Sequence, residues 1–513
     1  MNIWLDVTTL SEHGNSMSEN VCAQDCKTDG KDGPDAGIRP TPTSSNILAV
    51  LTKTKSDIQQ RFQHTFVRSK TLSIQSYAEG LWLVCYPLGS GKLAVLDDEA
   101  FGLLERFEGA TQLETVLDGY GSGKSKVAEV VSLLLQLGFV EDLDQPTAIR
   151  ETGRDQMLAS WLHVTNACNL GCHYCYVSKT AEHMTEDTSR QAVDAIIRSA
   201  VKNGYSSVHI TYAGGEASLQ LPQVIKIHDY ALLQAQEHDL QLFAGMISNG
   251  VAMPVRFIEQ LKQRKIGLAI SLDGVGADHD QQRPLVNGAG SFTFVDRTIT
   301  RLLAHGLIPN INVTVSQRNL ASLPRLLAYI LEKDLPFGLS YYRDNECSTQ
   351  YNDLQFSDAE MISGMRNAFA YIEAHLPNRT LLGALVDKTR MYGSRQHGCG
   401  VGRSYMAINQ RGGIASCQVD IANPVTSIHA DNPLQVIRDN RLGVQGVSVD
   451  EKEGCKSCQW RYWCTGGCAM LTYRLTGRSD IKSPNCAIYK ALFPDALRLE
   501  AARLLKYTAP ITF

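Results

Sequence analysis

The stretch Cys168-Asn-Leu-Gly-Cys172-His-Tyr-Cys175 decides how the rest of the chain is interpreted. Its three thiols follow a CxxxCxxC spacing, and thiols this close in sequence can converge on one soft metal centre. Thiolates bind zinc or iron–sulfur clusters in proteins. A [4Fe–4S] cluster needs four ligands, so three cysteines would leave one iron open to a small molecule. The alternatives are a three-cysteine zinc site and three unrelated buried thiols.

The other cysteines also favour metal binding. The sequence has 14 cysteines in 513 residues, and its start, residues 1–6, lacks the positively charged segment of a signal peptide. We therefore expect a cytoplasmic protein, in which clustered thiols are more often metal ligands than disulfides. Four cysteines are scattered outside the clusters: Cys22, Cys26, Cys85 and Cys347.

The composition is that of a soluble globular protein with two to four domains, since 43% of the residues are hydrophobic and 20% are charged. The net charge of −4 gives no basic excess that would indicate nucleic acid as a partner. No apolar run is long enough to span a membrane. We therefore expect neither nucleic acid nor a membrane as a partner.

An alternation of strands and helices follows from residue 158 to about 375. Helical patterns separate six apolar runs, and repeated βα units form a parallel sheet. In barrels built from such units, the chemistry lies at the C-terminal ends of the strands. The six predicted strands are Ala159–Thr165, Ser207–Tyr212, Leu240–Ser248, Gly267–Leu272, Asn310–Val315 and Gly338–Tyr342.

Two motifs together resemble the radical S-adenosylmethionine (SAM) superfamily. Tyr174 places an aromatic residue before the last cysteine of the first motif, and Ala213-Gly-Gly-Glu216 follows the second predicted strand. The resemblance implies an α/β fold with a partial (β/α)6 barrel over residues 156–380. It also implies that Cys168, Cys172 and Cys175 hold a [4Fe–4S] cluster whose open iron binds SAM. The reduced cluster would then cleave SAM to a 5′-deoxyadenosyl radical, which abstracts a hydrogen atom.

The same resemblance assigns residues to SAM. Glu216, with the backbone of its two glycines, would hold the amino group, and the polar ends of later strands would contact the ribose and carboxylate. Polar side chains are also common at barrel rims for structural reasons, which is the alternative. The predicted cofactor-binding residues are Tyr174, Gly214, Gly215, Glu216, Ser248, Asn249, Ser271 and Arg283.

Asp273 and Asp344 are candidate catalytic residues, because each carboxylate follows a predicted strand and could accept a proton from the substrate. The alternative for each is a carboxylate that caps a helix or stabilises a turn.

A second group of cysteines lies near the C-terminus, with seven thiols between Cys399 and Cys486. Two [4Fe–4S] clusters need about eight ligands, so seven thiols supply all but one of them. A pair of zinc sites is the alternative. Their order resembles the SPASM domain, which we expect at residues 385–513. By that resemblance Cys399, Cys417 and Cys468 hold auxiliary cluster I, which would either keep an open iron or take His397, water or the substrate as its fourth ligand. Auxiliary cluster II would be held by Cys455, Cys458, Cys464 and Cys486.

The N-terminal part contains a predicted segment with poor order, residues 1–70, and a compact module, residues 71–148. Two strands, Leu81–Tyr86 and Lys92–Leu96, form a hairpin that is followed by three helical patterns. This winged-helix-like pattern resembles the leader-recognition element of enzymes that modify ribosomal peptides, in which the leader adds a strand to the hairpin edge. A generic or DNA-binding winged helix is the alternative, which the lack of a basic recognition helix weakens.

Together the resemblances imply a radical SAM/SPASM maturase for a ribosomally made precursor peptide. We expect three [4Fe–4S] clusters, SAM, and an external electron donor of flavodoxin or ferredoxin type. The expected product is an oxidative crosslink, either a C–C cyclophane or a thioether. The alternatives are a sulfatase-type maturase that forms formylglycine, and a zinc-containing regulator that binds peptide or DNA.

Overall fold

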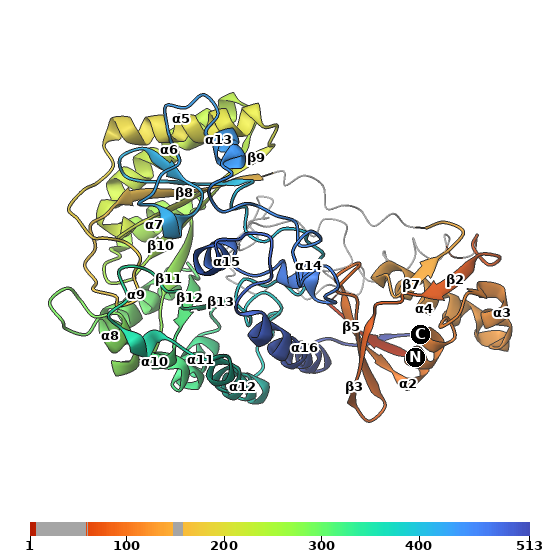
Figure 1. Cartoon of the computed structure of the whole chain (residues 1–513). Coiled ribbons are helices and arrows are strands. Elements are labelled where there is room, and N and C mark those ends of the chain that lie inside the picture. Colours follow the sequence, from red (N-terminus) through yellow and green to blue (C-terminus); the bar gives the residue numbers. More distant parts are fainter. Residues whose placement is uncertain (7–57, 59, 147–156) are drawn as a thin grey trace.

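The computed structural model describes residues 1–6, 58, 60–146 and 157–513 (Figure 1). Cys22 and Cys26, and most of the segment predicted to have poor order, lie outside the described residues. Among the residues described, no helix is both long and apolar enough to cross a membrane.

A curved sheet of parallel strands forms the centre of the molecule, and all six predicted strands are present in it. Each strand pairs in parallel with the next one along the chain. Within the described residues β13 pairs only with β12, so the barrel stays open on that side. The strands are β8 (Met157–Thr165), β9 (Ser207–Gly214), β10 (Gln241–Ser248), β11 (Gly267–Ser271), β12 (Asn310–Val315) and β13 (Phe337–Tyr341).

Helices cover the outer face of this sheet, which Figure 1 shows as a layer around the strands. Alternate strand residues point outward into one large core: on β12 these are Ile311, Val313 and Val315. The residues between them, Asn310, Asn312 and Thr314, therefore lie on the inner face, which is polar. The helices are α5 (Glu186–Lys202), α6 (Leu221–Glu237), α7 (Val255–Gln263), α9 (Phe292–Ala304), α11 (Leu323–Glu332) and α12 (Asp358–Ala374).

The cysteine-rich C-terminal region continues the same sheet, which the sequence did not predict. Strand β14 (Tyr405–Ile408) pairs in parallel with β8, and β15 (Gly413–Ala415) and β16 (Thr426–Ser427) follow antiparallel. The chain then forms α13 (Pro433–Asp439), α14 (Arg461–Cys464), α15 (Ala469–Thr476) and α16 (Cys486–Tyr507). The terminal helix expected from residue 487 onward is α16, which packs against α12.

The N-terminal module contains the predicted hairpin and the three helical segments after it. The hairpin strands are β4 (Leu81–Cys85) and β5 (Leu93–Asp97), and β3 (Ser73–Ala78) pairs with β4. A second small sheet has the order β6-β2-β7. Its strands are β6 (Thr111–Gln112), β2 (Thr65–Arg68) and β7 (Val140–Asp142), and the helices are α2 (Asp98–Glu105), α3 (Leu113–Asp118) and α4 (Lys124–Leu137).

The prediction that residues 1–70 have poor order is wrong at both ends. Strand β1 (Asn2–Trp4) lies on β5, and β17 (Ile511–Thr512) lies on β1, while β2 forms the middle of the second sheet. These strands are too short to show a pattern of their own, because their order comes from pairing with distant segments. As a result, both hairpin strands already have a neighbour on their outer side: β3 pairs with β4, and β1 pairs with β5. The leader had been expected to pair with one of these edges.

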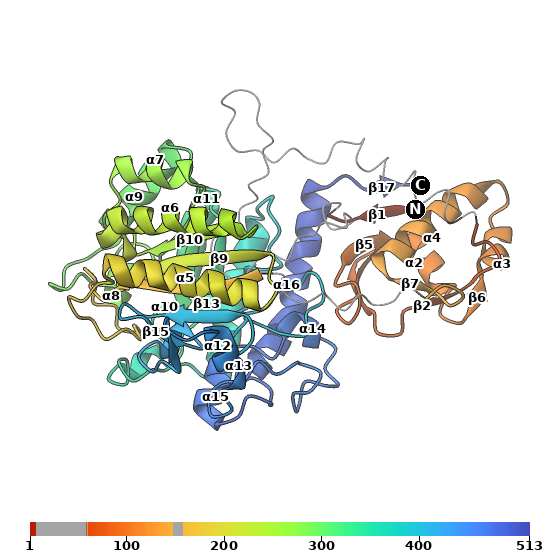
Figure 2. The same cartoon turned by 90° about the horizontal axis from the view of Figure 1, so that it is seen from above.

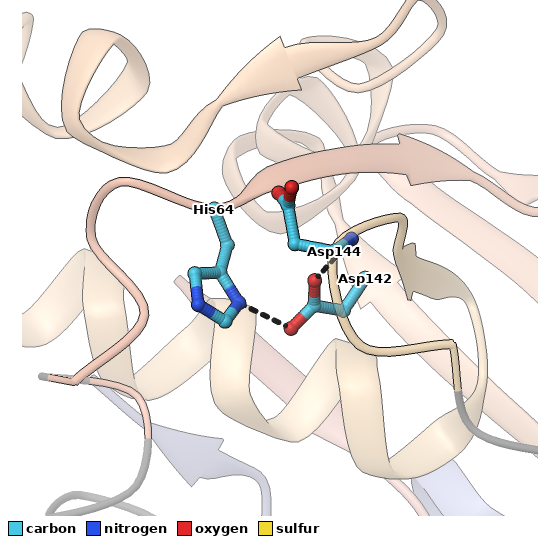
Figure 3. A group of neighbouring side chains, drawn as sticks. All are labelled: His64, Asp142 and Asp144. Carbon is cyan, nitrogen blue, oxygen red and sulfur yellow. Dashed lines mark hydrogen bonds and ion pairs between the residues drawn. The ribbon is translucent and has the colours of Figure 1, made fainter.

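A cluster of hydrogen-bonded side chains around Asp142 stabilises the end of β7 in the N-terminal module (Figure 3). One carboxylate oxygen of Asp142 is 2.9 Å from His64 Nδ1 and 3.1 Å from the Arg61 guanidinium. The other oxygen accepts the backbone N–H groups of Asp144 and Gln145. Burial alone would raise the Asp142 pKa, but these hydrogen bonds outweigh it and lower the pKa. Because Arg61 already supplies a positive charge, the cluster is a structural fastening rather than a cation site.

Candidate active site

The loop after β8 carries the three cysteines of the first motif. The backbone N–H of Gly171 donates to Pro284 O at 2.7 Å, and that of His173 donates to Gln282 O at 3.2 Å, so the loop is tied across the barrel end. Burial raises the pKa of Cys172 to about 11, and the charges of Arg283, Cys175 and Cys168 act on the same thiol. The Cys168 and Cys175 thiols are therefore near enough to act on the charge of Cys172, and three such thiols on one loop have the chemistry of an iron–sulfur cluster site.

Gly214 and Gly215 are needed where the second strand meets this loop. A Cβ atom on Gly214 would lie 2.4 Å from Thr165 O, and one on Gly215 would lie 2.5 Å from Ala167 O. The Gly215 N–H donates to Thr165 O at 2.6 Å across the same contact. Only glycine permits this close approach of two backbones.

Glu216 lies at the centre of a buried network with the predicted ribose contacts. Its carboxylate accepts the Ser218 N–H at 2.9 Å, the Ser248 hydroxyl at 2.8 Å and the Asn249 N–H at 2.6 Å. The Asn249 side chain donates to Asn169 Oδ1 at 2.7 Å, within the cysteine loop. The predicted SAM-binding residues of the second and third strand ends are thus brought together beside Cys168, and their role toward SAM stays a prediction.

Tyr174, Arg283 and Asp273 form a second buried network. The Tyr174 hydroxyl donates to Asp273 at 2.6 Å, and the Arg283 guanidinium contacts that hydroxyl and lies 3.5 Å from Asp273. The other Asp273 oxygen accepts the Thr314 N–H at 2.7 Å. Both oxygens of Asp273 are thus engaged by protein groups, which favours the alternative that it is a structural carboxylate. Ser271 ends β11 on the inner face of the same sheet.

Asp344 lies in the loop after β13, which touches the cysteine loop. The neighbouring Asn345 side chain donates to Tyr174 O at 3.0 Å. The Asp344 carboxylate accepts the Tyr342 hydroxyl at 2.7 Å and the Gln355 amide at 2.6 Å. Whether it accepts a proton from substrate stays a prediction.

Four of the C-terminal cysteines line one pocket, together with Trp460, Tyr489 and Phe493. These are the four cysteines assigned to auxiliary cluster II: Cys455, Cys458, Cys464 and Cys486. Burial raises the pKa of Cys464 to about 12, and the three other thiols act on it in the same direction. Four convergent thiols with aromatic walls fit a tetrahedral or cubic thiolate site.

The cysteines assigned to auxiliary cluster I also come together, because Cys399, Cys417 and Cys468 lie in one small apolar cluster. Burial raises the pKa of Cys417 to about 12, with Cys468 as the next cause. Tyr176 joins this group to the first motif, because burial and then the Cys175 and Cys417 thiols raise its pKa. The Tyr176 phenol is therefore near thiols of both cysteine groups.

Sequence reasoning missed two residues on the inner face of β8, Trp161 and His163. Both are buried, and His163 Nε2 lies 2.7 Å from Asn166 Oδ1. Burial lowers the His163 pKa, so the imidazole is neutral and its Nδ1 is an acceptor. Among the described residues, His163 Nδ1 and Trp161 Nε1 have no hydrogen-bond partner, at a cost of about 1–3 kcal/mol each. The polar His163 within an apolar strand was the available signal.

Comparison with known proteins supports the superfamily. Residues 162–319 match the family model of the Radical SAM superfamily. An uncharacterized protein of Methanocaldococcus jannaschii is 28% identical over 182 residues, which are 35% of this chain and 61% of that protein. The cysteine-type anaerobic sulfatase-maturating enzyme of Clostridium perfringens is 21% identical over 64% of this chain and 93% of its own. Mycofactocin maturase MftC of Mycobacterium tuberculosis is 23% identical over 66% and 84%.

A solved structure supports the fold. Native anSMEcpe with bound AdoMet and Cp18Cys peptide covers 68% of this chain and 98% of its own, with a TM-score of 0.53 and 17% identity. A radical SAM domain implies a [4Fe–4S] cluster and SAM, which the thiols of the first motif fit. Residues 162–319 therefore form a radical SAM domain, and the proteins similar to this chain include peptide maturases.

Proposed function

We propose that this enzyme installs an oxidative crosslink, a C–C cyclophane or a thioether, in a ribosomally made precursor peptide. One observation carries the proposal: the Cys175 thiol of the first motif and the Cys417 thiol are both near enough to the Tyr176 phenol to raise its pKa. A site for hydrogen abstraction and a site for a further cluster would then border one space. Relatives named mycofactocin maturase and PqqA peptide cyclase support a peptide substrate.

The protein's part in the reaction is to hold the cofactors, to orient the peptide and to exclude water from the site. Bound at the first motif, a reduced [4Fe–4S] cluster with SAM would supply the deoxyadenosyl radical that abstracts a hydrogen atom. Glu216 and Asn249 fix the cysteine loop from one side, and the buried Arg283 fixes it from the other. The polar inner face of the sheet, with Trp161 Nε1 and His163 Nδ1 unpaired among the described residues, would orient the peptide.

The two C-terminal cysteine groups would hold two further clusters, three in all. Of the two hydrogens removed from the peptide, one would pass as an atom to the deoxyadenosyl radical and the other would leave as a proton. The one electron left on the peptide would pass to a C-terminal cluster and then to an external one-electron carrier. A net oxidation with formation of one new bond is the expected result.

A second candidate is a sulfatase-type maturase that converts a cysteine or serine side chain to formylglycine. The match to the Clostridium perfringens enzyme over 93% of its length favours it. The N-terminal module counts against it, because formylglycine formation does not require an element that grips a leader.

The deciding experiment is co-expression with a short open reading frame that neighbours the gene, followed by mass spectrometry of the peptide. Loss of two hydrogens with an internal link supports crosslinking. An aldehyde-reactive product with loss of the thiol's sulfur supports the second candidate. The Cys172→Ala variant is the control, in which the peptide should stay unmodified. A peptide that is unmodified by the intact enzyme in every neighbouring reading frame would contradict both functions.

A further inference from the structure

We propose that three exposed lysines around the pocket assigned to auxiliary cluster II form the docking surface for an acidic protein that carries one electron. The identity of this partner rests on the proposed function, because a reaction that leaves one electron on the peptide needs a carrier to remove it. The surface itself rests on the contacts and charges of the described residues. We call the three lysines the lysine rim: Lys456, Lys482 and Lys490.

The pocket has a buried wall on one side and partly exposed cysteines on the other. Helices α14 and α16, which Figure 2 shows side by side, contribute Cys464 and Cys486 to it. Trp460 and Phe493 line the pocket and are buried, whereas Cys458 and Cys486 are only partly buried. A cluster held by these thiols would therefore have an edge near the surface, where a carrier can bring its own cofactor close.

Two lysines of the rim lie beside the first cysteine of the pocket. Lys456 directly follows Cys455 in the chain and is exposed. The Lys482 side chain lies over Gly454, because a Cβ atom on that glycine would be 3.0 Å from Lys482 Cδ. The backbone N–H of Lys482 also donates to Glu453 O at 2.9 Å, which fixes the lysine next to this segment. Both ammonium groups thus belong to the border of the pocket.

The third lysine lies on the opposite side of the pocket. Lys490 is one turn after Cys486 on α16, lines the pocket and is exposed. Burial raises the pKa of Cys486, and the positive charges of Lys490 and Lys482 oppose that rise. The charges of the rim therefore reach the thiols, and the rim surrounds the place where a cluster would come nearest to the surface.

The rim keeps its positive charge, because no ion pair of the described residues includes any of its three lysines. The neighbouring acids are engaged elsewhere: Asp450 pairs with Arg461 at 2.9 Å, and Glu453 pairs with Arg478 at 3.0 Å. Glu451 is the remaining exposed acid of the segment before Cys455. Three positive charges thus stand against one free negative charge.

This local excess is opposite in sign to the net charge of the whole chain, which is −4. An acidic carrier would be repelled by the molecule as a whole and attracted at the rim, and such complementarity raises the association rate and selects the partner. Complexes between redox proteins are small and weak, so a few charges around a cofactor edge can direct them. In the complex, one electron would leave the pocket's cluster and reduce the carrier by one electron, and no bond would form or break.

The test measures the binding of flavodoxin, used as an acidic one-electron carrier, to the anaerobically purified holoenzyme by calorimetry at low salt. In the double variant Lys456→Glu with Lys482→Glu, we expect the dissociation constant to rise at least tenfold, with unchanged iron per chain. The control is Lys126→Glu with Lys265→Glu, which changes the net charge equally at two exposed lysines elsewhere and should raise it less than about twofold. High salt should remove the difference between the two variants, because ions screen exposed charges.

Three results of this experiment would overturn the proposal. They are an absence of flavodoxin binding to the unmodified holoenzyme, equal weakening in both double variants, and equally tight binding of cytochrome c, used as a basic one-electron carrier.

A second measurement covers the case in which the double variant loses iron. A carbodiimide joins lysine amines to carboxylates that touch them, so it should link flavodoxin to the lysine rim of the unmodified holoenzyme, as mapped by mass spectrometry. Links to other lysines alone would contradict the docking surface. Neither measurement needs peptide or SAM, so an enzyme that leaves its peptide unmodified would not affect the docking result, and a failure to dock would leave the proposed function intact.

Discussion

At the scale of single residues, the site is built from buried groups that already have protein partners. Asp273 and Arg283 are both buried, and Tyr174 bridges them from the cysteine loop. Burial raises the Tyr174 pKa far above its usual value, so the phenol stays protonated and donates to Asp273. The loop that holds the first three thiols is thus positioned by a charge pair that water does not reach.

Replacing Asp273 should loosen this loop. The change Asp273→Asn leaves Arg283 without its carboxylate partner, and breaking a buried pair costs about 3–5 kcal/mol. We expect a lower midpoint of thermal unfolding and less iron bound after anaerobic purification. The control is Glu186→Gln on the surface, where Glu186 and Arg190 are each 60% exposed and the change should cost less than about 1 kcal/mol. Equal effects of the two changes would refute the role given to Asp273.

Gly214 offers an equally specific test of the contact between β9 and the loop. In Gly214→Ala the new Cβ would lie 2.4 Å from the Thr165 carbonyl oxygen, which cannot move without shifting the loop. We expect loss of iron at the first motif, measured as iron per chain and by the absence of SAM cleavage. Gly338→Ala on β13 is the matched control, because its Cβ would meet no atom within 4 Å. Full iron binding by Gly214→Ala would show that the contact is unimportant.

At the scale of elements, helices are fastened to strands partly by buried, neutral histidines. His228 on α6 lies with its Nδ1 3.3 Å from the Tyr212 hydroxyl on β9. Burial lowers the His228 pKa from 6.5 to about 4. Helix α6 can therefore keep this position only while the imidazole is uncharged.

The free energy of unfolding should consequently depend on pH. Because the folded-state pKa is depressed, the unfolded chain binds a proton between pH 6.5 and 4 that the folded chain does not. The contribution of neutral His228 to the free energy of unfolding is fully present above pH 6.5. Below that it falls by about 1.4 kcal/mol per pH unit down to pH 4. We expect His228→Gln to reduce that slope in urea unfolding, and His238→Gln, at an exposed position, to leave it unchanged. An unaltered slope in His228→Gln would contradict the assignment.

At the scale of the whole molecule, the barrel, the C-terminal cysteine region and the N-terminal module share one framework. Strand β14 joins the C-terminal region to β8, and α16 runs from the Cys486 site to β17 on the module. The cysteine groups are therefore held by different elements of one body, and each should keep its cluster when another is lost.

Separate cysteine changes should test this independence. In Cys417→Ala and in Cys458→Ala we expect iron per chain to fall by about one third, because each would remove a ligand of one of the three proposed clusters. SAM cleavage at the first motif should continue in both. Cys85→Ala, at a buried thiol on β4 outside the cysteine groups, should leave the iron content unchanged. The scheme fails if the purified chain contains zinc in place of iron.

The sequence by itself determined the features that depend on short-range patterns. The CxxxCxxC loop, the glycines before Glu216 and the six parallel strands are local spacings, and the structure places each strand where its apolar run predicts it. Cysteine chemistry also made the grouping of the C-terminal thiols predictable, since few folds bring so many thiols together without a metal.

Tertiary structure alone decided which distant segments complete the sites. Asn2 pairs with Thr512 at the other end of the chain, and Asp273 receives its partners from Tyr174 and from Thr314. The unpaired ring nitrogens of Trp161 and His163 become visible only when the neighbours of β8 are known. Such contacts arise from packing between segments far apart in sequence, and no periodicity within either segment encodes them.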